Sequence, residues 1–178
     1  HPNRRFLYSV REMHDGAVCA YSIERSSGRL EFVNEVSSHG DAPAYICIDQ
    51  TGRNLLAANY GTGNLAAFPI HDDGSLGEAS EVIQNHGSSV NPTRQEGPHA
   101  HSIIVSPDNR FALAADLGLD KIFIYRFDQA RGRLISNTPP LVRTSSGAGP
   151  RHMVFHPTGN FLYAINELHS TLTVYAWI

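Results

Sequence analysis

At 178 residues the chain is long enough for one domain with a substantial core. Hydrophobic residues make up 41% of it and charged residues 17%, a balance that indicates a globular protein and excludes a disordered one. The formal net charge of −3 offers no basic surface to nucleic acid, and no apolar run is long enough to span a membrane. We expect neither kind of partner.

The predicted elements repeat along the chain. Four segments align with one another: residues 3–23, 49–70, 106–127 and 156–177. Each reads as a turn, an apolar strand, a short polar loop and a second strand that ends in an aromatic residue. An insertion at residues 88–97 makes the spacing between the second and third copies larger than the next spacing. This self-similarity predicts a repeat architecture.

Two further strands follow each of these segments. Turns such as Gly28-Arg29-Leu30 and Gly132-Arg133-Leu134 lead into a third strand, and runs such as AYICI (44–48) lead into the next copy. Four short strands per unit of about 50 residues are typical of a β-propeller blade. We therefore predict an all-β protein in which residues 1–178 form a single partial propeller of about three and a half blades.

Other fold classes fit the pattern less well. The β-branched and aromatic runs are short, and Gly, Pro, Asn or Asp interrupts them every eight to twelve residues, which disfavours helices. Several strands are apolar on both faces, as in residues 111–115. This favours sheets stacked face to face over a two-sheet sandwich, in which one face of each sheet meets water.

The innermost strand of a blade and the next strand form a hairpin, and its turn predicts which residues meet. Arg151 and Glu167 are equidistant from Gly159, so we expect them to lie opposite each other. The same counting places His101 opposite Asp116 in the preceding blade.

The repeat alignment separates two kinds of polar residue. Asn59, Asp116 and Asn166 share one column, so we interpret them as structural residues that close loops through side-chain hydrogen bonds. In contrast, His101, Arg151 and Glu167 differ from their equivalents in the other repeats, as expected where a site is built. The alternative is an ordinary cross-strand ion pair between Arg151 and Glu167 with no function.

Two longer motifs resemble a known family. GAGPRHMVFHPTGNFLYAINEL (147–168) and GPHAHSIIVSPDNR (97–110) are similar to the seven-bladed propeller lactonases, typified by 6-phosphogluconolactonase and related to carboxymuconate lactonizing enzyme. The resemblance implies that His101, Arg151 and Glu167 are catalytic and that His99 and His152 bind substrate. Family members are about twice as long, so the resemblance implies half a ring and a fragment of a longer chain.

The residue types suit the hydrolysis of a lactone, which needs a base, an oxyanion donor and a cation for an anionic substrate. His101 could act as base or acid, Glu167 could be the base or orient it, and Arg151 suits a carboxylate, a phosphate or the oxyanion. No Gly-x-Ser-x-Gly motif is present, which favours direct attack by water. His99 and His101 lack further convergent ligands, so we expect neither metal nor cofactor.

Three hypotheses follow. The first is hydrolysis of 6-phosphogluconolactone in the pentose phosphate pathway, the second a carboxymuconate-type lactonizing enzyme, and the third a non-catalytic binding scaffold. The expected partner is a small anionic lactone. Cys19 and Cys47 lie in apolar runs and indicate reduced thiols, hence the cytoplasm. We expect a monomer for the full-length protein and self-association for this half-ring, whose end blades would be uncovered.

Overall fold

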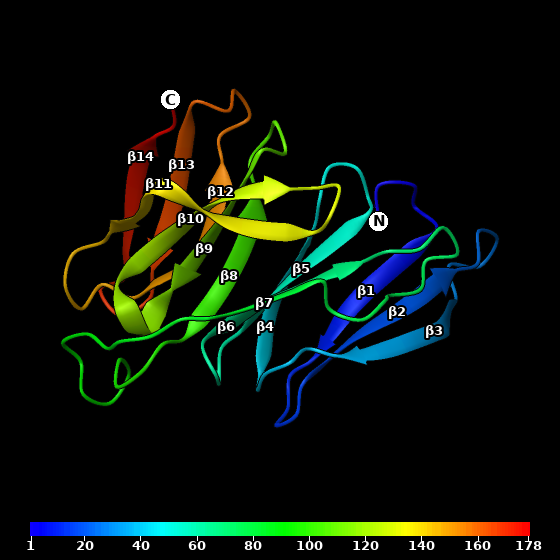
Figure 1. Ribbon diagram of the computed structural model, residues 1–178, viewed down its shortest axis with the longest axis horizontal. Helices are drawn as coiled ribbons and strands as arrows, with labels where there is room; N and C mark the ends of the chain where they lie inside the picture. The colour runs from blue at the N-terminus through cyan, green and yellow to red at the C-terminus, as the bar shows by residue number, and fades with distance from the viewer.

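The computed structural model, which describes residues 1–178, contains four antiparallel sheets that follow one another along the chain (Figure 1). The first contains β1 (Phe6–Arg11), β2 (Ala17–Ile23) and β3 (Leu30–Ser37). The second contains β4 (Pro43–Ile48), β5 (Asn54–Asn59), β6 (Asn64–Pro69) and β7 (Glu81–Gln84). The third contains β8 (Ala100–Val105), β9 (Phe111–Asp116), β10 (Lys121–Asp128) and β11 (Arg133–Arg143), with the helical turn η1 (Leu117–Leu119) after β9. The fourth contains β12 (Pro150–Phe155), β13 (Phe161–Asn166) and β14 (Thr171–Ala176).

These sheets are propeller blades, as predicted. Within each sheet the strands lie side by side in sequence order, so every pair of neighbours is joined by a hairpin. The four sheets fan out from the first blade at the N-terminus, coloured blue in Figure 1, to the fourth at the C-terminus, coloured red. None of the helices is long and apolar enough to cross a membrane.

Each pair of neighbouring blades encloses its own hydrophobic core. Strand β5 serves two of these cores, because Leu55 and Ala57 pack toward the first blade while Leu56 and Ala58 pack toward the third. All four side chains are fully buried. Strand β9 likewise directs Ala114 to the second blade and Ala115 to the fourth. The apolar character of both strand faces, noted in the sequence, thus reflects face-to-face stacking.

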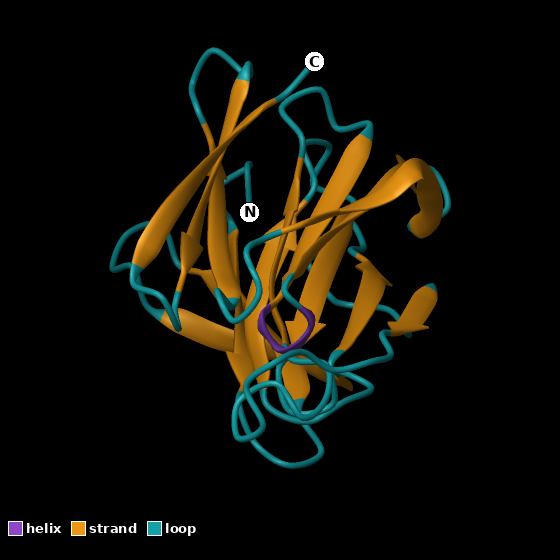
Figure 2. Cartoon of the chain, turned by 90° about the vertical axis from the view of Figure 1, so that its left-hand side faces the viewer, coloured by secondary structure: helices purple, strands orange, loops and turns teal.

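The first strands of the last three blades, β4, β8 and β12, lie next to one another, with β8 in contact with the other two. They run from the same end of the molecule, where long loops gather beside the short helical turn (Figure 2). Side chains at the beginning of these three strands therefore converge on one region.

The register corrects the predicted hairpin pairing. Asp116 pairs with Ala100, and Ser102 already pairs with Ala115, so His101 is the extra residue of a β-bulge. In the last blade Pro150 pairs with Asn166 and Met153 with Ala164, which places the shift at Arg151 and His152. The expected pairings of His101 with Asp116 and of Arg151 with Glu167 are therefore wrong as strand register. A bulge leaves one residue unpaired and re-aims its side chain.

The structural role predicted for the recurring column is confirmed. Asn59 is fully buried and donates from Nδ2 to the carbonyl of Ser38, at 2.9 Å. Asn166 donates to the hydroxyls of Thr171 and Thr173. Asp116, also fully buried, accepts hydrogen bonds from Asn85 and from the backbone of His99. All three side chains hold loop or strand ends in place.

Both cysteines are free thiols, as the sequence indicated. Cys19 is buried, whereas Cys47 is half-buried and packs against the core between the second and third blades. Burial raises the pKa of the Cys47 thiol to about 11, so it stays protonated at neutral pH.

One face of the last blade is apolar and uncovered. Leu172 pairs with Ile165 across β14 and β13, and Val174 pairs with Tyr163, so these side chains share a face. Leu172, Val174 and Ile165 are 61%, 53% and 48% exposed. A contiguous apolar face of this kind is characteristic of an association surface.

We predict that the 178-residue chain by itself self-associates through this face. Replacing Leu172 and Val174 together by Glu should shift the chain toward monomer, because charges would then oppose burial of the face. Sedimentation velocity measures the change, and Met13→Glu, at a similarly exposed loop position, serves as the control. If the chain without substitutions sediments as a stable monomer, the prediction is contradicted.

Candidate active site

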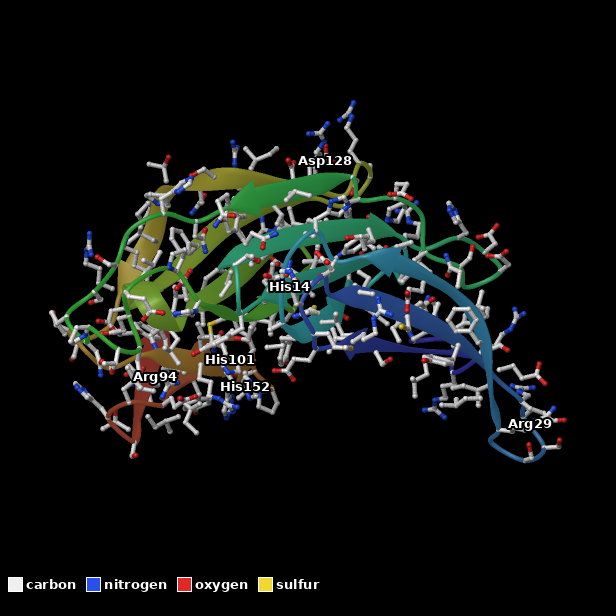
Figure 3. The ribbon with its side chains drawn as sticks, turned by 90° about the horizontal axis from the view of Figure 1, so that it is seen from below. His14, Arg29, Arg94, His101, Asp128 and His152 are labelled. Atoms are coloured by element: carbon white, nitrogen blue, oxygen red, sulfur yellow. The ribbon has the colours of Figure 1, made fainter.

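A polar cavity of about 320 Å³ lies where the inner strands begin. The eight residues that line it are Glu12, Ala44, Tyr60, Arg94, His101, Arg151, His152 and Glu167. They come from all four blades, and in Figure 3 the labelled Arg94, His101 and His152 lie close together at the lower left of the view.

Two positions of the repeat supply most of this lining. One is the bulge at the start of the inner strand, which contributes Ala44, His101 and the pair Arg151 and His152. The other is the residue directly after the next strand, which contributes Glu12, Tyr60 and Glu167. Because the blades are equivalent, these positions recur at the same height and build one cavity.

Packing holds the bulges of neighbouring blades together. The hydroxyl of Ser102, next to the bulge of β8, donates to the carbonyl of Arg151 in β12 at 2.7 Å. The ring of His152 lies against those of His101 and Tyr45, with centroids 5.2 and 5.4 Å away. The three inner strands are thus fixed to one another through their bulge residues and neighbours.

His101 is the most buried ionisable group of the cavity, with 8% of its surface exposed. Its Nδ1 is buried and has no hydrogen-bond partner. Burial, assisted by the charge of Arg151, lowers the pKa of His101 to about 4. The imidazole is therefore neutral at pH 7 and has a lone pair to offer, which favours a base over the acid that the sequence left open.

Glu167 connects two arginines. Its Oε1 accepts a short hydrogen bond from Nη2 of Arg94, and its Oε2 lies 2.9 Å from Nε of Arg151. The latter contact is an ion pair without hydrogen-bond alignment, since Nε of Arg151 has no hydrogen-bond partner. The predicted meeting of Arg151 and Glu167 is thus found, although the strand register does not pair them.

The charge state of Glu167, which the sequence left open, follows from this arrangement. Burial raises the pKa of Glu167, but the hydrogen bond from Arg94 and the charges of Arg94 and Arg151 outweigh it and lower the pKa overall. The carboxylate is therefore ionised and already occupied by two cations. This makes Glu167 an anchor for the arginines and a poor base.

Of the five residues predicted for the site, His101, His152, Arg151 and Glu167 line the cavity and His99 does not. The ring of His99 stacks on that of Tyr60, with centroids 4.6 Å apart. Its Nδ1 lies 2.9 Å from the carbonyl of Tyr60, and its Nε2 lies 3.2 Å from Glu96. Substrate binding by His99 stays a prediction. The contacts of the His99 side chain favour a role in holding Tyr60 in place.

Sequence reasoning missed Arg94, Tyr60 and Glu12 as lining residues. Tyr60 and Glu12 occupy the repeat position of Glu167, so the alignment itself contained their signal. Arg94 lies in the insertion at residues 88–97, outside the repeat, and no alignment column marks it. The one sequence feature that indicated Arg94 is its place in an insertion a few residues before His99 and His101.

Comparison with known proteins agrees with this geometry. A family model described as "Lactonase, 7-bladed beta-propeller" matches residues 1–178. The chain belongs to this lactonase family. It is 33% identical over 167 residues to the 6-phosphogluconolactonase of Bacillus subtilis, covering 93% of this chain and 46% of that protein. The 6-phosphogluconolactonase of Klebsiella pneumoniae is 37% identical over 174 residues, or 98% of this chain and 48% of the relative.

Solved structures of the family have the same blades. The periplasmic gluconolactonase of Pseudomonas aeruginosa superposes with a TM-score of 0.94 at 36% identity, over 99% of this chain and 52% of that one. The chain spans about half the length of the curated relatives it matches. The four blades described here thus correspond to about half of such a lactonase.

One buried carboxylate fixes the loops that carry both arginines. Asp120 accepts hydrogen bonds from the Ser89 hydroxyl and the Gln95 amide, and from the backbone N–H groups of Gly147 and Gly149. The first two residues flank Arg94 in its loop, and the two glycines precede Arg151. Burial raises the pKa of Asp120, but these hydrogen bonds outweigh it and lower the pKa overall.

We predict that Asp120→Asn lowers the free energy of unfolding by about 2–4 kcal/mol, because an amide cannot accept all four hydrogen bonds. Asn tolerates the left-handed backbone of this position, where φ is 53°, so no strain is added. Asp72→Asn, at an exposed turn, is the control. Denaturant unfolding measures the difference.

The pH dependence gives this prediction a second readout. Since the folded-state pKa of Asp120 is lowered, its stabilisation is full above the unfolded pKa of about 4 and is lost at lower pH. The gap between wild type and Asp120→Asn should therefore close as the pH falls through that range. A gap that is independent of pH would exclude the carboxylate as its cause.

A separate prediction concerns His101. Its imidazole should titrate with a midpoint near 4, because burial and Arg151 disfavour the cation. NMR of labelled histidine side chains, with His101→Gln to assign the resonance, measures the midpoint directly. A midpoint at the ordinary value near 6.5 would show that the cavity does not suppress protonation.

Proposed function

We propose that this chain forms half of a seven-bladed ring that hydrolyses a sugar lactone, with 6-phospho-D-glucono-1,5-lactone as the substrate and 6-phosphogluconate as the product. The observation that carries the proposal is a buried, neutral imidazole beside Arg151 in a polar cavity. The names of the curated relatives support the substrate, and the thiols Cys19 and Cys47 support the cytoplasm as the location.

In the proposed mechanism His101 acts as the base. Its unprotonated ring nitrogen removes a proton from water as the water oxygen bonds to the lactone carbonyl carbon. The carbonyl π electrons move to oxygen, and the guanidinium of Arg151 stabilises the resulting oxyanion. When the oxyanion collapses, the bond from carbon to the ring oxygen breaks and the imidazolium protonates that oxygen. The product is the open-chain acid, which ionises in water.

The other cavity residues prepare this step. Glu167 holds Arg151 through the 2.9 Å ion pair and keeps the guanidinium next to His101 before substrate arrives. His152, whose ring contacts His101, limits the orientations of the base and contributes to binding. An anionic substrate brings negative charge to the imidazole and thereby favours its protonation during the reaction.

A rate assay tests the proposal. The complete ring is incubated with freshly prepared 6-phosphogluconolactone, and product formation is compared with spontaneous opening in the same buffer. Hydrolysis above this background supports the proposal. Turnover of a carboxymuconate lactone alone would assign the site to a lactonizing enzyme, and activity on neither compound would favour a binding scaffold.

We predict that Arg151→Ala in the complete ring lowers kcat/KM by about 10²- to 10³-fold, the loss expected when one oxyanion donor is removed. Folding should change little, because the side chain of Arg151 is 41% exposed. Arg143→Ala, at an exposed site at the end of β11, is the matched control. Near-normal turnover by Arg151→Ala would remove this arginine from the mechanism.

A further inference from the structure

The loop between β7 and β8 brings a second arginine to the cavity. It spans residues 85–99 and forms the long green segment at the lower left of Figure 1. Arg94 lines the cavity from this loop and contacts Glu167, as described above. Its Nη2 also lies 3.4 Å from the hydroxyl of Tyr60. No repeat position explains this residue, and the proposed chemistry does not use it.

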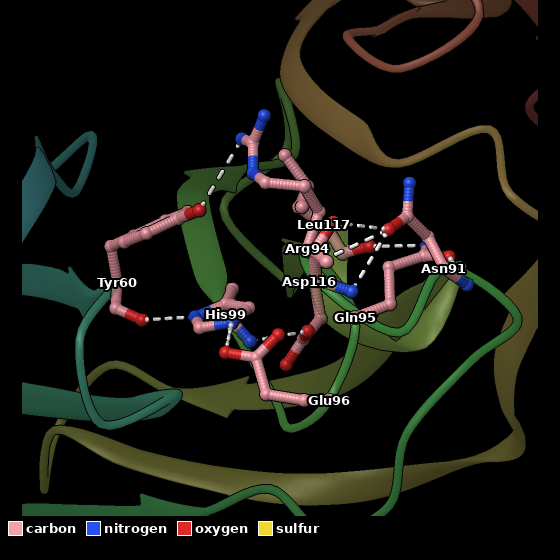
Figure 4. A network of polar contacts seen from close by, with 9 residues as sticks. Tyr60, Asn91, Arg94, Gln95, Glu96, His99, Asp116 and Leu117 are labelled. Carbon is pink, nitrogen blue, oxygen red and sulfur yellow. Dashed lines mark hydrogen bonds and ion pairs between the residues drawn. The ribbon is translucent and has the colours of Figure 1, made fainter.

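Two buried carboxylates hold the loop in one conformation. Asp116 accepts a hydrogen bond from Asn85 at the start of the loop and another from the His99 N–H at its end, each at 2.8 Å. Asp120 holds the middle through Ser89 and Gln95, and Gln95 is fully buried beside Arg94. Figure 4 shows Arg94 projecting from this anchored segment toward Tyr60. The backbone that carries Arg94 is therefore ordered before any ligand binds.

The guanidinium of Arg94 keeps donors in reserve. Only its Nη2 has protein partners, which leaves the N–H groups of Nε and Nη1 available, and 42% of the side chain is exposed. A guanidinium with adjacent free N–H groups matches the spacing of oxygens in a phosphate or a carboxylate. The cavity thus contains a fixed cation with unused capacity for an anion.

The two arginines occupy different places around Glu167. Arg151 lies against one carboxylate oxygen and belongs to the bulge that also carries His152, which contacts His101. Arg94 lies against the other oxygen and reaches the hydroxyl end of Tyr60. One cation is therefore beside the base, and the other is across the carboxylate from it.

A phosphorylated sugar lactone likewise presents two anionic groups during hydrolysis. Negative charge develops on the oxygen at C1 during hydrolysis, while the phosphate is carried at C6, at the other end of the molecule. We infer that Arg94 binds this distal anionic group and makes the site selective for lactones that carry one. The inference rests on the proposed function, because it assigns a second role within the same cavity.

Substitution of Arg94 tests the inference in the complete ring. Arg94→Gln should lower kcat/KM for 6-phosphogluconolactone by about 10- to 100-fold, the range expected for lost hydrogen bonds to a charged group. The loss should fall mainly on KM, since the distal group is bound equally in the ground and transition states. Glucono-1,5-lactone, which lacks the phosphate, should show a much smaller loss, which reflects only the missing contact of Arg94 with Glu167.

Arg131→Gln is the matched control, because Arg131 is an exposed arginine that pairs with Asp128 in a turn away from the cavity. Equal losses of Arg94→Gln on both lactones would overturn the inference, since Arg94 would then act only through Glu167. Unchanged kinetics on both would overturn it as well.

A binding measurement separates this inference from the proposed function. Calorimetry compares the affinity of wild type and Arg94→Gln for 6-phosphogluconate and for gluconate. A loss of affinity confined to the phosphorylated compound supports the role of Arg94, even if the wild type hydrolyses neither lactone. Absence of hydrolysis by the wild type contradicts the proposed function alone. Equal affinities of the two proteins for 6-phosphogluconate would overturn the role of Arg94 whatever the activity.

Discussion

Face-to-face packing of the blades is the constraint on which the site depends. Because neighbouring sheets stack face to face, β4, β8 and β12 lie side by side and begin at one end of the molecule. The bulge at the start of each strand turns a side chain out of the ladder there. The bulges of β4, β8 and β12 thus bring Ala44, His101, Arg151 and His152 to one cavity without any irregularity of the fold as a whole.

The electrostatics of the cavity follow from unequal burial. His101 is almost fully buried next to a cation and stays neutral, whereas Glu167 is partly open, lies between two cations and stays ionised. One side chain can therefore accept a proton while the other fixes the arginines. Their roles differ because their surroundings differ, which a list of residue types does not reveal.

The repeat made the fold predictable from sequence, since the strands and their grouping into blades follow from the alignment. The proximity of Arg151 and Glu167 also followed from counting along the hairpin. The bulge at His101 could not be predicted in this way, because an unpaired residue leaves no trace in the spacing of apolar residues. The pKa of His101 and the position of Arg94 depend on packing between blades and on an irregular loop, and neither is encoded in a local pattern.

A crystal structure of the complete ring with bound 6-phosphogluconate tests the central claim most directly. The account predicts the carboxylate of the product next to His101 and Arg151, and its phosphate on the free donors of Arg94. Product bound at another place in the ring would contradict the account. A phosphate bound to Arg151, with Arg94 making no contact with it, would also contradict the account.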